Sequence, residues 1–343
     1  MPVNRNINEN SDGIFRSLGN IDHVVKELDP TSYLARVSLE YAVSHSKRDL
    51  LDYLIERLLL SGNEESREWA EIYQLDNMVY KGEISLVDSI HKLTYIHCAS
   101  TEMSILRKIF QLYNYYDLKA FQMIEILSGL IDNEINLLEN SYMKDSFQSR
   151  LNLAMQSVHI HLNRLEESRK YGLQLKAIAS TPIMKAIAYK NIALSYMFED
   201  YEKSIAYFYN SLTILKKLQN HNESNNVQRI MNFVHSYWEH PEKTEWIRKE
   251  TIDEIHTYVF SLIKKGDKEL AIKVLDEAKN KIENDFQQGY HNYFRGLITD
   301  EEKYYYESVK FFSKSGDQFF RQLPLTALKE KGVDTMLLSA LSV

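Results

Sequence analysis

The segment covering residues 289–332 constrains the fold of this chain more than any other. Gly296 is followed twelve residues later by Ser308, with the charged turn TDEE between them. Ser308, Phe312 and Ser315 then recur at a four-then-three spacing, which keeps them on one face of a helix. Small residues at such positions let two antiparallel helices approach closely, as in hairpins of the tetratricopeptide type. Because one hairpin cannot cover its own apolar face, we expect further copies.

The same spacing occurs twice upstream. The two earlier sets are Ser204, Phe208 and Ser211, and Ala271, Leu275 and Ala278. The three sets begin two unit lengths and then one unit length apart, for a unit of roughly 34 residues. The unit between the first two, around Tyr237 and Trp238, is degenerate. We therefore predict an all-α fold, a right-handed superhelix of tetratricopeptide-like helical hairpins.

Four segments are expected along the chain. Residues 1–12 are polar and predict a disordered arm, and residues 13–30 predict short helices that end at Asp29-Pro30. Residues 31–332 form the predicted helical-repeat domain, and residues 333–343 a capping or dimerisation segment. The chain has only 11 glycines and 5 prolines in 343 residues, which favours helix almost throughout.

Charge and cysteine content limit the functional classes. A formal charge of −7 argues against general coating of nucleic acid, although a local basic patch stays open. Cys98 is the single cysteine, so no internal disulfide forms. We find no signal peptide and no apolar run of roughly 18–20 residues, so we expect no membrane span and a location in the cytoplasm.

Sequence motifs of catalysis and of metal binding are missing. The chain has no phosphate-binding glycine loop, no H-E-x-x-H, no G-x-S-x-G and no C-x-x-C. His159 and His161 are two residues apart, about 200° around a helix, so they cannot share a metal. His97-Cys98 has no partner at ligand spacing. We expect a protein that is not an enzyme, with no catalytic residue, metal or cofactor.

The concave wall of a helical superhelix suits a bound peptide. In the stretch 146–168, Arg150, Ser157 and His161 fall close to one helical face, while the apolar residues take another. Asn191 and Ser195 form a second polar pair at a spacing of four. These side chains are candidates for peptide binding, and the alternative is a hydrated groove without a ligand.

Several passages resemble the AimR family of phage arbitrium receptors. They are ARVSLEYA at 35–42, FQSRLNLAMQSVHIHLNRLEESRKY at 147–171, LAIKVLDEAKNKIEND at 270–285, and YFRGLITDEEKYYYESVKFFSKSGDQFFRQLPLTALKEKG at 293–332. The resemblance extends from about residue 33 to the end. It implies a tetratricopeptide-like superhelix that dimerises at its C-terminal end and binds a short phage-encoded peptide, with an N-terminal helix-turn-helix domain on the operator. In that family the peptide suppresses activation of a lysis-promoting transcript.

The resemblance also implies individual site residues. Asp317, which follows Gly316, matches the family's acidic residue that meets the N-terminal part of the peptide. Ser157, His161 and Leu194 fall where asparagines that hold the peptide backbone are expected. The anchoring arginine falls near Ile183, or at Lys185 if a short gap is allowed. These departures indicate a different peptide from the family's, with loss of peptide binding as the alternative.

The N-terminal region departs further from the family. Only 34 residues precede ARVSLEYA, and residues 1–30 hold three Lys or Arg against five Asp or Glu, so no basic reading helix is available. DNA binding therefore stays open. We expect the sensing and dimerising part, which acts on a protein partner or pairs with a full-length relative.

The C-terminal tail is apolar. Met336, Leu337, Leu338 and Leu341 predict a dimer contact, with packing on the last hairpin as the alternative. The leading hypothesis is a phage or prophage receptor that binds a short peptide and controls the lysis–lysogeny decision. The second hypothesis is a helical-repeat scaffold that holds a protein partner and senses nothing.

Overall fold

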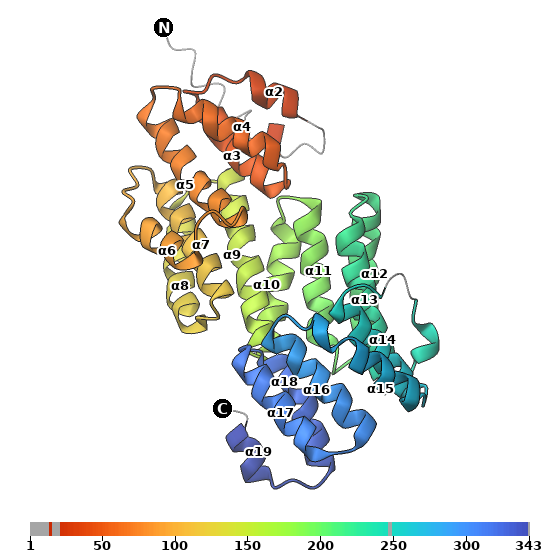
Figure 1. Cartoon of the computed structure of the whole chain (residues 1–343). Helices are drawn as coiled ribbons and strands as arrows, with labels where there is room; N and C mark the ends of the chain where they lie inside the picture. Colours follow the sequence, from red (N-terminus) through yellow and green to blue (C-terminus); the bar gives the residue numbers. More distant parts are fainter. Residues whose placement is uncertain (1–13, 16–20, 246–248, 342–343) are drawn as a thin grey trace. The chain divides into compact units, whose positions relative to one another are not determined.

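The computed structural model describes residues 14–15, 21–245 and 249–341, and these are helical with no strand (Figure 1). The α-helices are α2 (Asp22–Glu27), α3 (Tyr33–Ser44), α4 (Arg48–Leu59), α5 (Glu64–Tyr80), α6 (Leu86–Tyr95), α7 (Thr101–Asp117), α8 (Phe121–Leu137), α9 (Tyr142–His161), α10 (Leu165–Ile178), α11 (Pro182–Tyr196), α12 (Tyr201–Lys217), α13 (His221–Tyr237), α14 (Ile252–Lys264), α15 (Lys268–Glu277), α16 (Asp285–Thr299), α17 (Glu302–Lys314), α18 (Gln318–Glu330) and α19 (Thr335–Leu341), with short 3₁₀ turns η1 (Pro241–Lys243) and η2 (Lys279–Lys281). The all-α prediction is confirmed. The expected arm at 1–12 lies outside the described residues, and α2 lies within the stretch 13–30.

The helices form two compact units. Unit 1 comprises residues 1–155 and 173–185, and unit 2 comprises residues 156–172 and 186–343. In each unit, successive helices pair as hairpins, such as α4 with α5 and α16 with α17. The chain is thus a series of helix pairs, as the repeated spacing predicts.

Short polar breaks in the sequence end the helices where they are expected. Gly82 follows α5 and Gly266 follows α14, and both have the positive φ that glycine adopts without strain. Asp267 then accepts a hydrogen bond from the backbone N–H of Leu270 at the start of α15. Glycine after one helix and a capping acid before the next therefore define these hairpin turns.

The small residues of the repeat spacing bring paired helices together. Ser204 donates a hydrogen bond to the carbonyl of Ala193 at 3.0 Å, and Ser308 donates one to the carbonyl of Gly289 at 2.7 Å. A Cβ at Gly296 would lie 2.7 Å from the ring of Tyr305, so only glycine fits there. The hairpin of α16 and α17 therefore depends on the residues that carry the sequence pattern.

The degenerate unit predicted around Tyr237 and Trp238 is incomplete in the structure. After α13 the described residues contain only the 3₁₀ turn η1 before α14 begins at Ile252. Asn232 holds this connection, since its amide donates to the carbonyl of Glu245 at 2.6 Å and accepts from its N–H at 3.0 Å. The side chain of Asn232 therefore anchors the main chain at residue 245.

The interior of unit 1 contains a paired charge. Glu40 on α3 is fully buried, and its carboxylate accepts from Arg150 on α9, Nε at 2.7 Å and Nη2 at 3.1 Å. Tyr73 also donates to it at 2.7 Å, and Ser146 donates to it as well. Burial opposes ionisation of Glu40, but the charge of Arg150 and these hydrogen bonds hold its pKa below the ordinary value.

The interior of unit 2 is aromatic and contains uncharged histidines. The rings of Tyr290, Phe294 and Phe312 pack with centroids 5.3–5.6 Å apart. His256 is 3% exposed, and neither of its ring nitrogens has a hydrogen-bond partner among the described residues. Burial lowers the pKa of His256 to about 3, with the neighbouring His291 and Arg229 acting in the same direction. This imidazole is therefore neutral near pH 7.

Candidate peptide-binding face

The C-terminal half of α9 presents two polar side chains on one face. Ser157 and His161 are four residues apart and so lie one helical turn apart. Each is joined to another helix of unit 2, Ser157 to Asn191 on α11 and His161 to Asp317 before α18. We call Ser157, His161, Asn191 and Asp317 the α9 polar face.

Asp317 is the acidic centre of this face. Its Oδ2 lies 2.8 Å from Nδ1 of His161, and its Oδ1 accepts the backbone N–H of Phe320 at 2.7 Å, which caps α18. Because a carboxylate only accepts, Nδ1 of His161 carries the hydrogen. The side chain of Asp317 is 3% exposed, whereas that of His161 is 25% exposed. The pair is thus anchored on one side and open on the other.

Asn191 extends the face towards α11. Its amide nitrogen donates to the Ser157 hydroxyl at 3.3 Å and to the side-chain oxygen of Gln156 at 3.4 Å. Gln156 in turn donates to the carbonyl of Ala188 at 3.1 Å. A Cβ at Gly172 would lie 2.2 Å from the Gln156 amide, so the small residue on α10 makes room for this arrangement. Asn191 is 6% exposed, so its amide orients the half-buried Ser157, and it is the Ser157 hydroxyl that suits the backbone of an extended peptide.

Two other candidate residues are used inside the protein. Arg150 is 5% exposed and is bound to Glu40 in unit 1. Ser195 is fully buried, donates to the carbonyl of Ile192 and accepts from Arg169 Nε at 3.1 Å. Both side chains hold helices together, so we leave them out of the peptide-binding face proposed below.

The remaining candidates are more open. Lys185 is exposed on α11 and belongs to unit 1, and Leu194 is half-buried on α11 in unit 2. The structure does not join either to the four residues of the α9 polar face.

Arg321 is a neighbour of Asp317 that the sequence analysis missed. It is 6% exposed and donates to the hydroxyl of Ser313 at 3.1 Å. Burial lowers the pKa of its guanidinium, while the charge of Asp317 opposes that shift. The sequence signal was the acid–base spacing of four from Asp317 to Arg321, which is typical of a helical pair.

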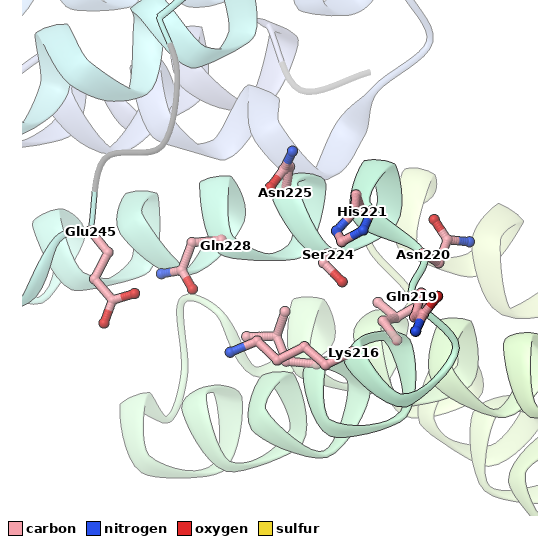
Figure 2. A pocket seen from close by; sticks show the side chains of 10 residues that line it. Lys216, Gln219, Asn220, His221, Ser224, Asn225, Gln228 and Glu245 are labelled. Carbon is pink, nitrogen blue, oxygen red and sulfur yellow. The ribbon is translucent and has the colours of Figure 1, made fainter.

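A separate cavity of about 230 Å³ lies where α12 turns into α13 (Figure 2). Its lining residues are Leu212, Leu215, Lys216, Gln219, Asn220, His221, Ser224, Asn225, Gln228 and Glu245. None of the candidate peptide-binding residues lines it. The sequence signal for this cavity was the polar run NHNESNNVQ at 220–228.

The tail helix α19 is partly covered. Leu338 is 9% exposed, whereas Met336 is 80% and Leu337 46% exposed, and Leu341 is half-buried. The side chain of Leu338 therefore packs inward, as the alternative of packing on the last hairpin requires, while Met336 and Leu337 face water. Leu338 therefore fits packing on the last hairpin, whereas Met336 and Leu337 stay available for a dimer contact.

Two further properties bear on the class of protein. No helix in the described ranges is long and apolar enough to cross a membrane. The same ranges hold no group of three or more His, Cys, Asp or Glu placed to bind a metal ion.

These features define an all-helical repeat protein with a polar face between its helix pairs. Residues 18–330 match the family model described as "AimR transcriptional regulator-like", and the chain belongs to this family. The resemblance drawn from the sequence passages is therefore confirmed. Because the family consists of regulators, membership also supports the expectation of a protein that is not an enzyme.

Individual proteins of this family are similar to the chain in sequence and in structure. The chain is 28% identical to the AimR transcriptional regulator of Bacillus phage phi3T over 92% of this chain and 82% of the relative. It is 27% identical to that of Bacillus phage SPbeta, over 92% and 81%. A solved structure of selenomethionine-labelled phAimR superposes with a TM-score of 0.83 at 28% identity, covering 94% of this chain and 83% of that one. The structure described as phAimR-Ligand gives 0.77 at 25% identity, covering 96% and 98%.

Proposed function

We propose that the chain is a phage or prophage receptor that binds a short signalling peptide and thereby controls the lysis–lysogeny decision. Support comes from the family, from the likeness to a ligand-bound phAimR structure, and from the α9 polar face. The observation that carries the proposal is the pairing of Asp317 with His161 at 2.8 Å. It places a carboxylate beside a partly exposed imidazole, a suitable partner for the cationic N-terminus of a peptide.

The remaining polar side chains fit the same ligand. Ser157, oriented by the buried amide of Asn191, supplies a hydroxyl on the face that carries His161, and a hydroxyl binds backbone N–H and C=O groups. Lys185 and Leu194 are secondary candidates on α11. The departures from asparagine at 157, 161 and 194 favour a peptide that differs from those of relatives.

The test uses the full chain and synthetic hexapeptides taken from short reading frames beside its gene. A peptide at a hundred times its Kd adds about 2.7 kcal/mol of stability, seen as a higher melting temperature. We expect Asp317→Asn to weaken binding at least tenfold, since it removes the charge but retains a capping oxygen for α18. Asp267→Asn is the matched control, because Asp267 also follows glycine and caps its helix.

A panel in which no peptide raises the melting temperature would favour the scaffold hypothesis instead. Equal peptide affinity in Asp317→Asn and the parent chain would exclude the α9 polar face. Whether regulation acts through DNA or through a protein partner is separated by a gel shift with the upstream region at moderate salt, where non-specific binding is weak.

We further propose that two copies pair through the tail. Met336 and Leu337 are exposed apolar side chains at the end of the chain, and burying them against a second copy removes them from water. Sedimentation should show a dimer for the parent chain and a monomer for Met336→Lys/Leu337→Lys, with the helix content by circular dichroism unchanged and a lower melting temperature because association no longer stabilises the fold. A variant that remains dimeric would place the contact elsewhere.

A further inference from the structure

A second cavity lies in unit 1, between α4 and α5, and we call it the α4–α5 cavity. Its volume is about 280 Å³, close to the lower end of the range for small-molecule sites. The side chains of Ile55, Leu59 and Met78 form the apolar part of its wall. The α9 polar face and the cavity at α12 and α13 both belong to unit 2. The α4–α5 cavity is therefore not part of the site described above.

The charged side chains that line the α4–α5 cavity are mostly acidic. Asp52 and Glu56 lie one turn apart on α4, Glu83 follows α5, and Lys81 is the base. Like charges four residues apart on a helix repel each other, so Asp52 and Glu56 favour a cation beside them. Lys81 is paired with Asp52 at 2.8 Å. Glu56 and Glu83 are exposed, and neither has an ion-pair partner within the described part of the chain.

Asp52 is bonded through only one of its two oxygens. Lys81 Nζ donates to Oδ1 at 2.8 Å, and Asn77 Nδ2 donates to the same atom at 2.6 Å. The hydrogen bonds from Lys81 and Asn77 hold the pKa of Asp52 below its ordinary value, and the charge of Arg48 acts in the same direction. The guanidinium of Arg48 itself lies over the ring of Tyr80. Oδ2 of Asp52 is therefore a charged acceptor to which no described residue donates.

Asn77 supplies a second acceptor, and this one is buried. The residue lines the α4–α5 cavity and is 4% exposed. Because the carboxylate of Asp52 only accepts, the amide nitrogen of Asn77 must face it, and the other amide atom is the carbonyl Oδ1. Oδ1 has no hydrogen-bond partner among the described residues. A buried acceptor without a donor costs free energy, so a ligand that donates to Oδ1 would stabilise the fold.

These groups specify the chemical class of the ligand. Oδ2 of Asp52, Oδ1 of Asn77 and the carboxylate of Glu56 are all acceptors, and an ammonium brings three N–H donors and no acceptor. A metal ion does not fit, because the ranges that the structure describes hold no group of three or more His, Cys, Asp or Glu that could bind one. The acids are thus spread along the cavity, which suits a ligand with two separate positive charges. The apolar wall suits methylene groups between those charges.

We propose that the α4–α5 cavity binds an aliphatic diamine in its doubly charged form. One ammonium donates to Oδ2 of Asp52 and to Oδ1 of Asn77. The other meets Glu56, one turn further along α4 and about 6 Å away along the helix axis. The methylene chain lies against Ile55 and Leu59. The ligand thereby links α4 to α5 and adds to the stability of unit 1.

The probe is putrescine, titrated into the full chain by isothermal calorimetry at constant ionic strength. We expect putrescine to bind at least tenfold more tightly than butylamine, which has one ammonium, and we expect no binding of butanediol, which has none. Glu56→Gln should weaken putrescine tenfold or more, because it removes the charge that meets the second ammonium. Glu277→Gln is the matched control, since it removes an exposed glutamate of α15 in unit 2, and it should leave the affinity unchanged.

Asn77→Leu separates binding from folding. Leucine is similar in size to asparagine and removes the buried carbonyl that has no donor, while Lys81 remains bonded to Asp52. The helix content by circular dichroism should therefore match that of the parent chain, whereas the affinity for putrescine should fall tenfold or more. Parent-like affinity in Asn77→Leu or in Glu56→Gln overturns the proposal. So does an equal loss of affinity in Glu277→Gln, or no binding of putrescine by the parent chain.

Two other occupants of the α4–α5 cavity give their own signatures, and each would overturn the proposal. Equal affinities for butylamine and putrescine would assign the cavity to a single ammonium, such as the lysine side chain of a protein partner. Displacement of putrescine by Mg²⁺ at constant ionic strength would assign it to a metal ion.

Discussion

The two units bury polar groups in opposite ways. Unit 1 contains a full ion pair, Glu40 with Arg150, whose carboxylate also accepts from Tyr73 and Ser146. Unit 2 contains the imidazole of His256 among aromatic rings, without a hydrogen-bond partner among the described residues. The ion pair of unit 1 is stable only while Glu40 and Arg150 are both charged, whereas the imidazole of His256 in unit 2 must stay uncharged.

This contrast shows which disturbance each unit is most sensitive to. A buried ion pair tolerates removal from water only while each charge has its partner, so a single substitution is harmful. A buried neutral imidazole is harmless until a proton binds, so acidification is harmful. Unit 1 should therefore respond most to mutation of its pair, and unit 2 to pH.

Breaking the pair in unit 1 should have the largest effect. Glu40→Gln leaves Arg150 buried without its counter-charge, and such a loss destabilises by about 3–5 kcal/mol. Hydrogen exchange followed by mass spectrometry should show lost protection in α3, α5 and the first half of α9. Denaturant unfolding gives the size of the change.

Two controls accompany this variant. Glu40→Leu/Arg150→Met removes both charges together and should be less destabilising than Glu40→Gln. Glu199→Gln breaks the contact with Arg169 in unit 2, where the carboxylate is half exposed, and should cost under about 1 kcal/mol. If Glu40→Gln were no worse than Glu199→Gln, burial of the unit 1 pair would have no energetic consequence.

Acidification should affect unit 2 through His256. Its pKa is about 3 in the folded chain, against 6.5 for an unperturbed histidine, so the unfolded chain takes up the proton first. Stability is therefore unaffected above pH 6.5 and is lost as pH falls from 6.5 towards 3. At pH 5 the loss from this residue is about 2 kcal/mol. Denaturant unfolding at a series of pH values measures it.

His256→Phe should flatten that pH dependence, because the ring remains and the proton site is removed. Some slope remains, since burial also lowers the pKa of His235 and of His291 to about 4 each. The exposed His221 gives the matched control, and His221→Phe should keep the parent slope. If the free energy of unfolding depended on pH equally in the parent chain and in His256→Phe, protonation of His256 would not destabilise the fold.

Much of the fold could be predicted from the sequence because the repeat spacing reports packing directly. Ser204, Ser308 and Phe312 are buried where one helix meets the next, and Gly296 accommodates a tyrosine ring. The helix breaks followed from glycine and capping residues, which act locally. Each of these residues lies within a few positions of the helix end that it determines.

The candidate site was predicted less completely, since helical spacing states which residues share a face but not what covers that face. Arg150 was grouped with Ser157 and His161, yet its partner Glu40 is 110 residues away in sequence. Ser195 likewise meets Arg169, 26 residues upstream. Asp317 was placed by its position after Gly316 and by family resemblance, and only the structure joins it to His161.

The two hydrogen bonds between the side chain of Asn232 and the main chain of Glu245 have a consequence for sequence variation. Both hydrogen bonds reach the main chain of residue 245, one to its carbonyl and one from its N–H. The amide of Asn232 therefore recognises a peptide group and ignores the side chain attached to it. Natural variants are free to replace Glu245 with almost any amino acid, and proline is the exception, because it has no N–H to give.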